Sequence, residues 1–368
     1  MIDIHFSGSK PANKYEDEIA NLKEPRFAIY EEDLSNIKIN LEEYKKYSKI
    51  ILIGSEGLTS SFSIYLRALK GNGKKVFILN YADPDIIVNL MKEYTPIDTL
   101  VICVTNSIFD IVDMESVHQF NNYPMLVITQ ADNNQFQLVA NYYSWKIITQ
   151  KPIENEYSSF SSSALIPAEI FGLPLDRIIL GAKNIYKSCS PLSSPDKNIA
   201  WQAASFLYRL GLIGKNGIIL TLNSYYLETS FKLIHQLIQY VNNVSQKDCI
   251  GIELNNLREN LIINSSKNNN VGILVSVKQR RCNHIINNFP DDLLNISSGM
   301  TKISDINKQS LEKRVVEEFE KYIQEFESNK IPYIRIELQK IDSQNIAEFI
   351  AFWQYLAHYL SIMQGKNS

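Results

Sequence analysis

Hydroxyl side chains gather in one short stretch of this sequence, SSFSSSALIPAEIFGLPLDRIILGA, which runs from 158 to 182. Its serines stand directly ahead of an apolar run, the order expected where a helix begins. Hydroxyl groups there either cap free backbone N–H groups or contact a ligand, and both interpretations stay open for Ser158 and Ser159. A second pair, Thr105 and Ser107, follows an apolar strand-like run, where ligand contact and ordinary turn chemistry are both expected alternatives.

Histidines and basic residues give further candidates for chemistry. His235 lies in FKLIHQLIQ, within an apolar helical stripe, which favours a core or interface histidine over a catalytic one. His284 follows a compact basic cluster formed by Lys278, Arg280 and Arg281. Such a cluster is typical of a solvated face, and an anion site is the alternative.

Composition bounds the size of the fold and the class of partner. The chain has 368 residues, of which 45% are hydrophobic and 21% charged, enough for one large core or two ordinary ones. We therefore expect two lobes. The formal net charge of -3 provides no basic surface for a phosphate backbone, so a nucleic-acid partner is not expected and a small metabolite fits better.

The cysteines and the N-terminal residues indicate the compartment. The four cysteines stand far apart, without the paired spacing of a disulfide framework or a zinc site, and are expected to be reduced core thiols: Cys103, Cys189, Cys249 and Cys282. The start MIDIHFSGSKPANKYEDE has no basic region followed by an apolar run, and no window suits a membrane span. A cytoplasmic protein without a membrane partner is predicted.

Strand and helix patterns alternate regularly after a polar stretch at 1–45, and these elements would position the candidate side chains. Short, near-continuous Val/Ile/Leu runs predict buried parallel strands at 49–55, 74–80, 98–106, 124–130 and 145–150. Helical patterns lie between them at 60–69, 84–94 and 136–144. This alternation predicts a doubly wound, three-layer α/β domain.

The rhythm restarts after the serine-rich segment and predicts a second α/β lobe. Helices are expected at 165–186, 198–212, 226–242, 310–326 and 343–363, and strands at 217–223, 249–254, 270–277 and 333–338. The Pro/Ser-rich stretch 188–197 is the predicted linker. The predicted division is an N-terminal extension at 1–45, a first domain at 46–190 and a second at 191–368. On the last helix, a stripe of large side chains predicts core or subunit contact: Phe349, Trp353 and Leu356.

The 158–182 segment resembles a segment of the glucose-6-phosphate isomerase family, whose members are built of two sugar-isomerase (SIS) domains. Further similar segments follow in the family's order: the glycine-rich turn ILIGSEGLTSS, the strand and loop TLVICVTNS, the helix YLETSFKLIHQL and the late helix IAEFIAFWQYLAHYLSIM. The resemblance covers roughly 45–363. It implies two SIS-like doubly wound domains, each a parallel sheet flanked by helices in a three-layer sandwich, and a homodimer.

In that family a sugar phosphate binds where loops leave the carboxyl ends of parallel strands. A glutamate moves a proton between two sugar carbons, an arginine steadies the developing charge, and a histidine and a lysine help to open the ring. The resemblance therefore implies a small phosphorylated sugar as partner and no metal or organic cofactor.

Carried over residue by residue, the resemblance implies a partly retained phosphate site. The expected contacts are Gly54, Gly57, Thr59, Ser60, Thr105, Ser107, Ser158 and Ser159. Leu58 falls on the family's serine in the first turn, which leaves Thr59 and Ser60 as substitutes. Without gaps, Asn106 falls on the family's lysine and Asp110 on a phosphate-binding threonine, whereas a slip of two residues puts Asp110 on an ordinary acidic position.

The catalytic positions are replaced in the same alignment. Glu154, Asn155 and Glu156 stand in place of the triplet that carries the arginine, and Tyr240 stands in place of the glutamate base. A tyrosine of ordinary pKa, near ~10, is a poor base for a carbon acid.

Three further positions complete the alignment. Leu257 falls near the expected histidine, with Glu253 and Glu259 as the alternative carboxylates, and Lys366 is the candidate for the lysine, without its motif. The residues that would carry catalysis are therefore unknown.

These replacements predict a glucose-6-phosphate isomerase-like protein that binds a sugar phosphate and has lost proton transfer. One alternative is a working isomerase of glucose 6-phosphate and fructose 6-phosphate whose catalytic residues lie elsewhere in the chain. The other is an unrelated α/β enzyme that shares only the helix segment.

Overall fold

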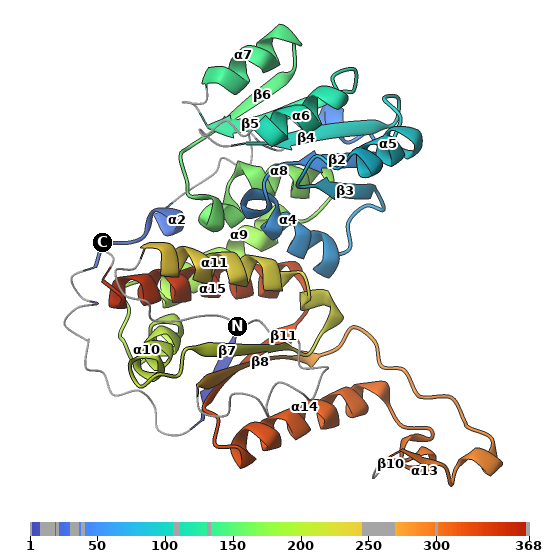
Figure 1. The fold of residues 1–368 in the computed structure, drawn as a ribbon, viewed down its shortest axis with the longest axis vertical. Helices are drawn as coiled ribbons and strands as arrows, with labels where there is room; N and C mark the ends of the chain where they lie inside the picture. Colours follow the sequence, from blue (N-terminus) through green and yellow to red (C-terminus); the bar gives the residue numbers. More distant parts are fainter. Residues whose placement is uncertain are drawn as a thin grey trace. The chain divides into compact units, whose positions relative to one another are not determined.

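The computed structural model describes residues 2–7, 19, 22–29, 37, 41–105, 111–130, 134–244, 269–298 and 301–365. They form two compact units that interleave along the chain (Figure 1). The larger unit takes Pro11–Tyr208, Tyr226–Cys249 and Asp342–Ser368, and the smaller takes Met1–Lys10, Arg209–Tyr225 and Ile250–Ile341. The predicted domain boundaries stay predictions, because these units describe packing and not independent folding.

The larger unit contains a five-stranded parallel sheet in the order β3-β2-β4-β5-β6. Its strands are β2 (Lys49–Ile53), β3 (Lys75–Leu79), β4 (Thr99–Val104), β5 (Met125–Gln130) and β6 (Lys146–Gln150). All five were predicted. The near-continuous apolar runs reflect burial on both faces, since every residue of β4 and β5 is buried.

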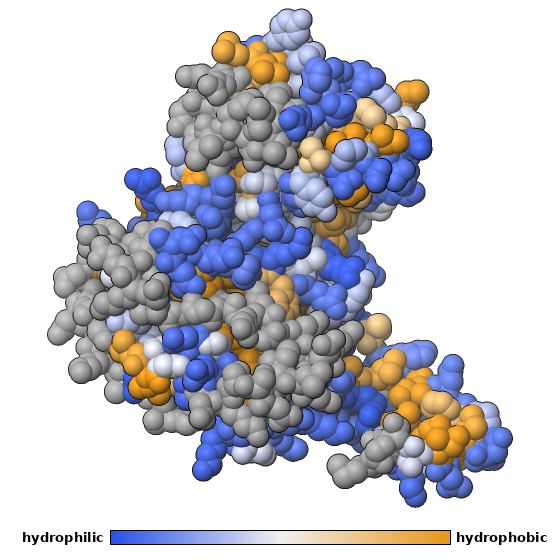
Figure 2. Space-filling view, in the orientation of Figure 1, coloured by the Kyte–Doolittle hydropathy of each residue, from blue (hydrophilic) through white to orange (hydrophobic). Residues whose placement is uncertain are grey.

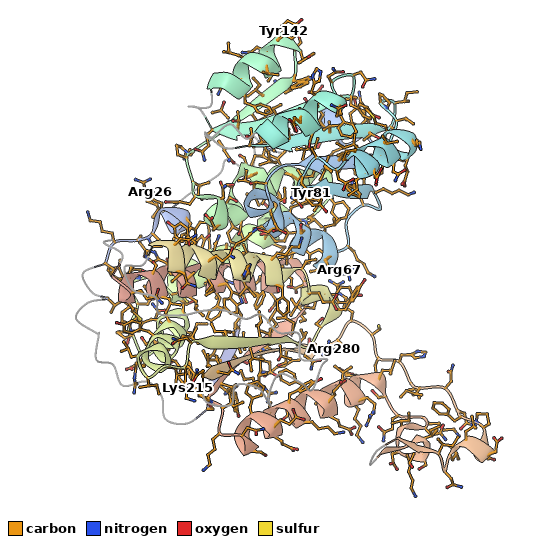
Figure 3. The ribbon with its side chains drawn as sticks, in the orientation of Figure 1. Arg26, Arg67, Tyr81, Tyr142, Lys215 and Arg280 are labelled. Carbon is orange, nitrogen blue, oxygen red and sulfur yellow. The ribbon has the colours of Figure 1, made fainter. Side chains whose placement is uncertain are left out.

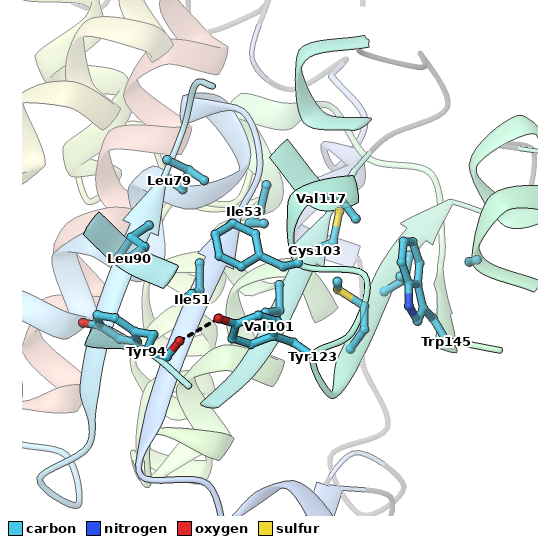
Figure 4. Close-up of a cluster of buried hydrophobic side chains, with 14 of the residues drawn as sticks. Ile51, Ile53, Leu79, Leu90, Tyr94, Val101, Cys103, Val117, Tyr123 and Trp145 are labelled. Atoms are coloured by element: carbon cyan, nitrogen blue, oxygen red, sulfur yellow. Dashed lines mark hydrogen bonds between the residues drawn. The ribbon is translucent and has the colours of Figure 1, made fainter. Parts of the chain in front are cut away.

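Helices cover both faces of this sheet and make the three layers visible in Figure 1. One face carries α5 (Pro84–Glu93), α6 (Ile111–Gln119) and α7 (Asn134–Tyr142). The side chains of β2 and β4 that meet these helices form a buried cluster, in which Tyr123 also donates a 2.7 Å hydrogen bond to the Tyr94 carbonyl (Figure 4). The opposite face carries α4 (Glu56–Ala68) and α8 (Ser162–Ile170).

The remaining helices of the larger unit follow or surround this sandwich. They are α2 (Arg26–Ile29), η1 (Glu42–Tyr44), η2 (Asn155–Phe160), α9 (Leu175–Ser188), α10 (Ile199–Leu212) as far as Tyr208, α11 (Ser230–Val244) and α15 (Ser343–Met363). Helix α15 packs against α9 and α11, and Phe349, Trp353 and Leu356 are fully buried there, which confirms the predicted core stripe.

One predicted helix is wrong in its continuity. The helix expected at 165–186 is two helices, α8 and α9, because Gly172 adopts a φ of 83° and Pro174 follows at the start of α9. The segment predicted as a linker joins α9 to α10. Hydrogen bonds fix its conformation, since the Asn198 side chain donates to the carbonyls of Cys189 and Ser190.

The smaller unit contains a four-stranded sheet in the order β1-β11-β8-β7. Strands β7 (Gly217–Leu222), β8 (Asn270–Gln279) and β11 (Tyr333–Lys340) are parallel, and β1 (Asp3–Phe6) adds an antiparallel edge. Helix α14 (Leu311–Ser328) packs on one face through Phe319, Ile323 and Phe326. The mixed α/β class with parallel sheets flanked by helices is confirmed.

Short elements complete the smaller unit: η4 (Asp291–Leu293), β9 (Ser297–Ser298), β10 (Thr301–Lys302) and α13 (Ile303–Ile306). The short helix η3 (Tyr225–Leu227) spans the point in the chain where the smaller unit gives way to the larger. Around α13 and β10, Figure 2 shows a hydrophobic surface, to which Ile285, Leu293 and Ile296 contribute exposed side chains. The strand expected at 249–254 lies outside the described residues.

The cysteine prediction holds for two of the described positions. Cys103 and Cys189 are buried thiols, and burial raises the pKa of Cys189 to about 11. Cys282 is exposed just beyond the end of β8, so its assignment to the core is wrong. Cys249 lies outside the described residues.

A buried ion pair anchors α8 to the segment after η1. Glu169, 8% exposed, lies 2.8 Å from Lys45, and this hydrogen bond is the main cause that raises the pKa of Lys45 above its ordinary value. A raised lysine pKa means that the stabilisation is fully present at neutral pH and is lost only as the pH rises through that pKa, above 10.5.

Lys45→Met should therefore destabilise the protein by about 1.5 kcal/mol at pH 7, because it leaves Glu169 buried without its cation. Urea unfolding measures this change. Lys75→Met is the matched control, since Lys75 pairs with Glu93 at 3.7 Å with both side chains more than half exposed. Equal effects of the two substitutions would contradict the assignment.

Candidate functional site

The candidate site lies at the carboxyl ends of β2 and β4, which are parallel neighbours with Ile53 opposite Cys103. From β2 the chain winds to β3 on one side, and the later strands β4, β5 and β6 extend the sheet on the other. The order therefore reverses between β2 and β4. In open α/β sheets, ligands bind outside the carboxyl ends of the strands at such a switch point.

Gly54 allows the two strand ends to approach closely. A Cβ atom at this position would lie 2.6 Å from the carbonyl oxygen of Val104. Gly57 has a similar role against the segment after β6, since its Cβ would lie 3.0 Å from the Cβ of Asn155. Both glycines expected at the site therefore bring three segments of the larger unit together: the β2–α4 turn, the end of β4 and η2.

Ser55 is the residue at this turn that sequence reasoning missed. It is the N-cap of α4, yet its side chain makes no capping hydrogen bond, and its buried hydroxyl has no partner among the described residues. The ungapped alignment placed the family's serine at Leu58, which is a core residue only 1% exposed. The signal that identifies Ser55 is its place between the strand-ending Gly54 and the first helical residue.

Thr105 is the second hydroxyl at the switch point. It directly follows β4 and is 1% exposed, and its Oγ1 has no hydrogen-bond partner among the residues described. A buried polar atom without a partner is costly and unusual, so Thr105 is a strong candidate for a ligand contact. Ser107, Asn106 and Asp110 lie outside the described residues.

Thr59 and Ser60, the expected substitutes, point their hydroxyls at the protein. Thr59 donates to the carbonyl of Ser55 at 3.2 Å and accepts from the Asn80 amide at 2.6 Å. Ser60 donates to the Gly57 carbonyl at 3.4 Å, and both side chains are buried. Because Asn80 also donates to the Gly54 carbonyl, these bonds fix the shape of the turn.

Ser158 and Ser159 also have partners inside the protein. Ser158 donates to the carbonyl of Asn155 at 2.7 Å. The Ser159 hydroxyl accepts from Ser61 at 2.7 Å and from the Gln354 amide at 3.1 Å. These bonds tie η2 to α4 and α15, so the geometry assigns the two serines a positioning role, and their contact with a ligand stays a prediction.

The positions that the resemblance aligns with the family's arginine and glutamate base lie at η2 and on α11, respectively. The Asn155 carboxamide faces Gly57, and its Oδ1 is buried without a partner among the described residues. The ring of Tyr240 meets that of Tyr157 edge-on, with centroids 5.4 Å apart. Burial first, then Tyr240 and the charges of Glu154 and Glu156, raise the pKa of Tyr157 well above its ordinary value, so this phenol stays protonated at neutral pH.

Helix α11 also contacts the N-terminus of α4, through Lys232. Lys232, Gln236 and Tyr240 are spaced four residues apart and so share one helix face. At one end of this face Lys232 pairs with Glu56 of α4 at 2.6 Å, and at the other Tyr240 meets η2. Between them, Gln236 has a buried Oε1 without a partner in the described part of the chain.

We call Ser55, Thr105, Asn155 and Gln236 the switch-point residues. Each has a buried polar side-chain atom without a partner among the described residues, and each lies on a segment that meets the β2–α4 turn or the strand end beside it. Together they offer two hydroxyls and two carboxamides, which suit a polar, hydroxylated ligand. Leu257, Glu253, Glu259 and Lys366 lie outside the described residues.

The histidines and the basic cluster have other surroundings. His235 is half-buried on α11, and His284 is exposed in the smaller unit. In the basic cluster, Lys278 pairs with Asp3 at 2.6 Å, and this bond is the main cause that raises its pKa. Arg280, at the end of β8 (Figure 3), donates to the carbonyl of Asn223, and burial lowers its pKa.

The described part of the chain contains neither a metal-binding group of side chains nor a helix that could span a membrane. Within it, no group of three or more His, Cys, Asp or Glu side chains is placed to hold a metal ion. None of its helices is long and apolar enough to cross a membrane.

Known structures share this fold. A hypothetical protein from Thermus thermophilus superposes with a TM-score of 0.79 at 14% identity, over 96% of this chain and 90% of that one. A glucose-6-phosphate isomerase from Chlamydia trachomatis gives 0.72 at 13% identity, over 93% and 74%. A tagatose-6-phosphate ketose/aldose isomerase from Escherichia coli gives 0.53 at 12% identity, over 97% and 95%.

No protein-family model and no curated protein sequence matches the chain. The structural similarity spans the chain, so the chain has the SIS-like fold and the expectation of a likeness limited to one helix segment is wrong.

Proposed function

We propose that this SIS-like protein binds a small phosphorylated sugar at the β2/β4 switch point and is a glucose-6-phosphate isomerase-like binder that lacks the family's proton-transfer groups. The observation that carries the proposal is the pair of hydroxyls without a partner among the described residues, Ser55 at the N-terminus of α4 and Thr105 directly after the neighbouring strand β4. A phosphate supplies acceptor oxygens for both hydroxyls and for the backbone N–H groups of the first helical turn.

The site offers the sugar its own contacts. Asn155 and Gln236 each present a carboxamide oxygen, Oδ1 and Oε1, without a partner among the described residues, and such an oxygen accepts hydrogen bonds from sugar hydroxyls. The phosphate end is therefore assigned to the β2–α4 turn and the hydroxylated end to η2 and α11.

The loss of proton transfer rests on residue types at known places. Tyr240 packs edge-on against another phenol, and Asn155 occupies the η2 position beside Gly57. Neither side chain is a base of suitable strength for a proton on carbon, and a missing general base alone typically lowers the rate by about 10²–10⁴-fold.

Thermal stability in the presence of ligand tests the proposed binding. Glucose 6-phosphate and fructose 6-phosphate should raise the melting temperature, because a ligand at about 100 times its dissociation constant stabilises the folded state by about 2.7 kcal/mol. Glucose, fructose and inorganic phosphate are the controls. A chain that no phosphorylated sugar stabilises would contradict the proposal.

A second candidate is an active isomerase with displaced catalytic residues. It is favoured by one observation, the Glu56 carboxylate paired with the Lys232 cation at the same turn. The coupled assay with glucose-6-phosphate dehydrogenase separates the candidates. Turnover of fructose 6-phosphate that Glu56→Gln abolishes would support this second candidate, whereas binding without turnover supports the first. A homodimer and a cytoplasmic location stay predictions.

A further inference from the structure

We propose that Lys232 is the cation that receives the phosphate of the bound sugar, and that Glu56 is its exchangeable counter-ion. This inference rests on the proposed function and adds the charged contact that decides the ligand class. It selects a doubly charged phosphate over a neutral sugar or a sugar with a single weak charge.

The position of Lys232 at the turn comes from its partner. Its Nζ lies 2.6 Å from Oε1 of Glu56, and Glu56 is the first residue of α4, directly after the N-cap Ser55. The ammonium group is thus held at the first residue of α4, next along the chain to Ser55, whose hydroxyl has no partner among the described residues. The Lys232 cation and the Ser55 hydroxyl therefore both belong to the turn to which the phosphate is assigned.

The Lys232–Glu56 ion pair can open so that a ligand anion replaces Glu56. The side chains of Lys232 and Glu56 are 59% and 47% exposed, and ion pairs this exposed contribute little to stability. A phosphate dianion offers three oxygens and about twice the charge of a carboxylate. It therefore competes effectively with Glu56 for the ammonium group, and the flexible lysine stem lets Nζ follow the ligand.

The Glu56 side chain gives the turn its selectivity. A carboxylate in the first helical turn interacts favourably with the helix dipole, as an incoming anion would. Glu56 thus competes with weak anions for both the helix N-terminus and Lys232. Removing its charge should tighten binding of every anionic ligand and reduce the preference for phosphate over carboxylate.

The test measures dissociation constants of glucose 6-phosphate by isothermal titration calorimetry for the wild-type chain and for three variants. Lys232→Met should weaken binding about tenfold, because a charge-assisted hydrogen bond is lost. Lys232→Arg should restore most of it. Glu56→Gln should tighten binding about threefold, and it should also tighten binding of gluconate, the carboxylate probe.

The dependence of affinity on salt concentration distinguishes a direct contact between Lys232 and the phosphate from a merely structural role of Lys232. Wild-type affinity should fall between low and high ionic strength, and this fall should be smaller in Lys232→Met because a screened contact has been removed. Lys75→Met is the control, since it deletes an exposed lysine paired with Glu93 in the same unit, at the opposite end of the strands.

The outcomes separate the two proposals. If wild-type protein binds glucose 6-phosphate and Lys232→Met binds it equally well, the role of Lys232 is refuted and the proposed function stands. A Lys75→Met variant weakened as much as Lys232→Met would refute that role too. If the wild-type chain binds no phosphorylated sugar, the proposed function fails and this inference fails with it.

Discussion

Replacing Gly181 with valine is expected to destabilise the larger unit by about 3 kcal/mol, at the upper end of what overpacking costs. Gly181 lies in α9, and a Cβ atom there would lie 2.2 Å from the Gln344 carbonyl oxygen in α15 and 3.0 Å from the Cβ of Ala347. A backbone oxygen cannot rotate away as a side chain can. The two helices must separate, and α15 buries nearly its whole surface against its neighbours.

The measurement is urea unfolding followed by circular dichroism, with the free energy taken from linear extrapolation. Gly181→Ala should lie between wild type and valine, because alanine's better helix propensity offsets about 1 kcal/mol of the clash. Lys187→Ala, on an exposed position of the same helix, is the control and should change little. A stabilised Gly181→Ala protein would contradict the close α9–α15 contact.

The double substitution Ser55→Ala and Thr105→Val is expected to weaken glucose 6-phosphate binding about 100-fold. Each hydroxyl would contribute one hydrogen bond to a charged phosphate, and each such bond is worth about tenfold or more in affinity. The stability of the protein should stay within about 0.5 kcal/mol of wild type, because neither hydroxyl has a partner among the described residues. This combination of lost binding and retained stability is the signature of a ligand contact.

Calorimetric titration and urea unfolding of the same samples give both quantities. Ser63→Ala is the matched control, since Ser63 lies two turns further along α4 and its hydroxyl donates to the Thr59 carbonyl. That control should keep wild-type affinity. Loss of stability without loss of binding in the double variant would show that the two hydroxyls serve the fold alone.

Much of the fold could be predicted from the sequence because burial determines the pattern of hydrophobic residues along each strand and helix. The strands of the larger sheet are apolar on both faces, so β4 and β5 stand out as near-continuous runs. Helix α6 escaped prediction because its sequence IVDMESVHQ has little amphipathic pattern. Strand β1 escaped because it is a four-residue edge strand whose partner β11 is more than 300 residues away in the chain.

The candidate site was only partly predictable because its contacts join distant segments. The expectation that Gly54, Gly57, Thr105, Ser158 and Ser159 belong to one site came from the resemblance. Gly54 does bring the β2–α4 turn close to the end of β4, and Gly57 brings it close to η2. The roles of the serines depend on partners that no local pattern reveals. Ser159 accepts from Ser61, 98 residues away, and from Gln354, 195 residues away.

An ungapped alignment could not find Ser55, because it assigned the family's serine to Leu58, three residues further along the chain. Local geometry resolves this, since Ser55 directly precedes the first residue of α4 and is its N-cap. Lys232 has no counterpart among the roles that the resemblance assigned. Its place follows only from the packing of α11 against α4, which the spacing of residues in the chain does not encode.

Isothermal titration of the wild-type protein with glucose 6-phosphate, with glucose as the reference, tests whether the chain binds a phosphorylated sugar. We expect saturable binding of the phosphorylated sugar at one site per chain and no measurable heat of binding with glucose. Equal binding of both sugars, or no binding of any phosphorylated sugar, would contradict this expectation.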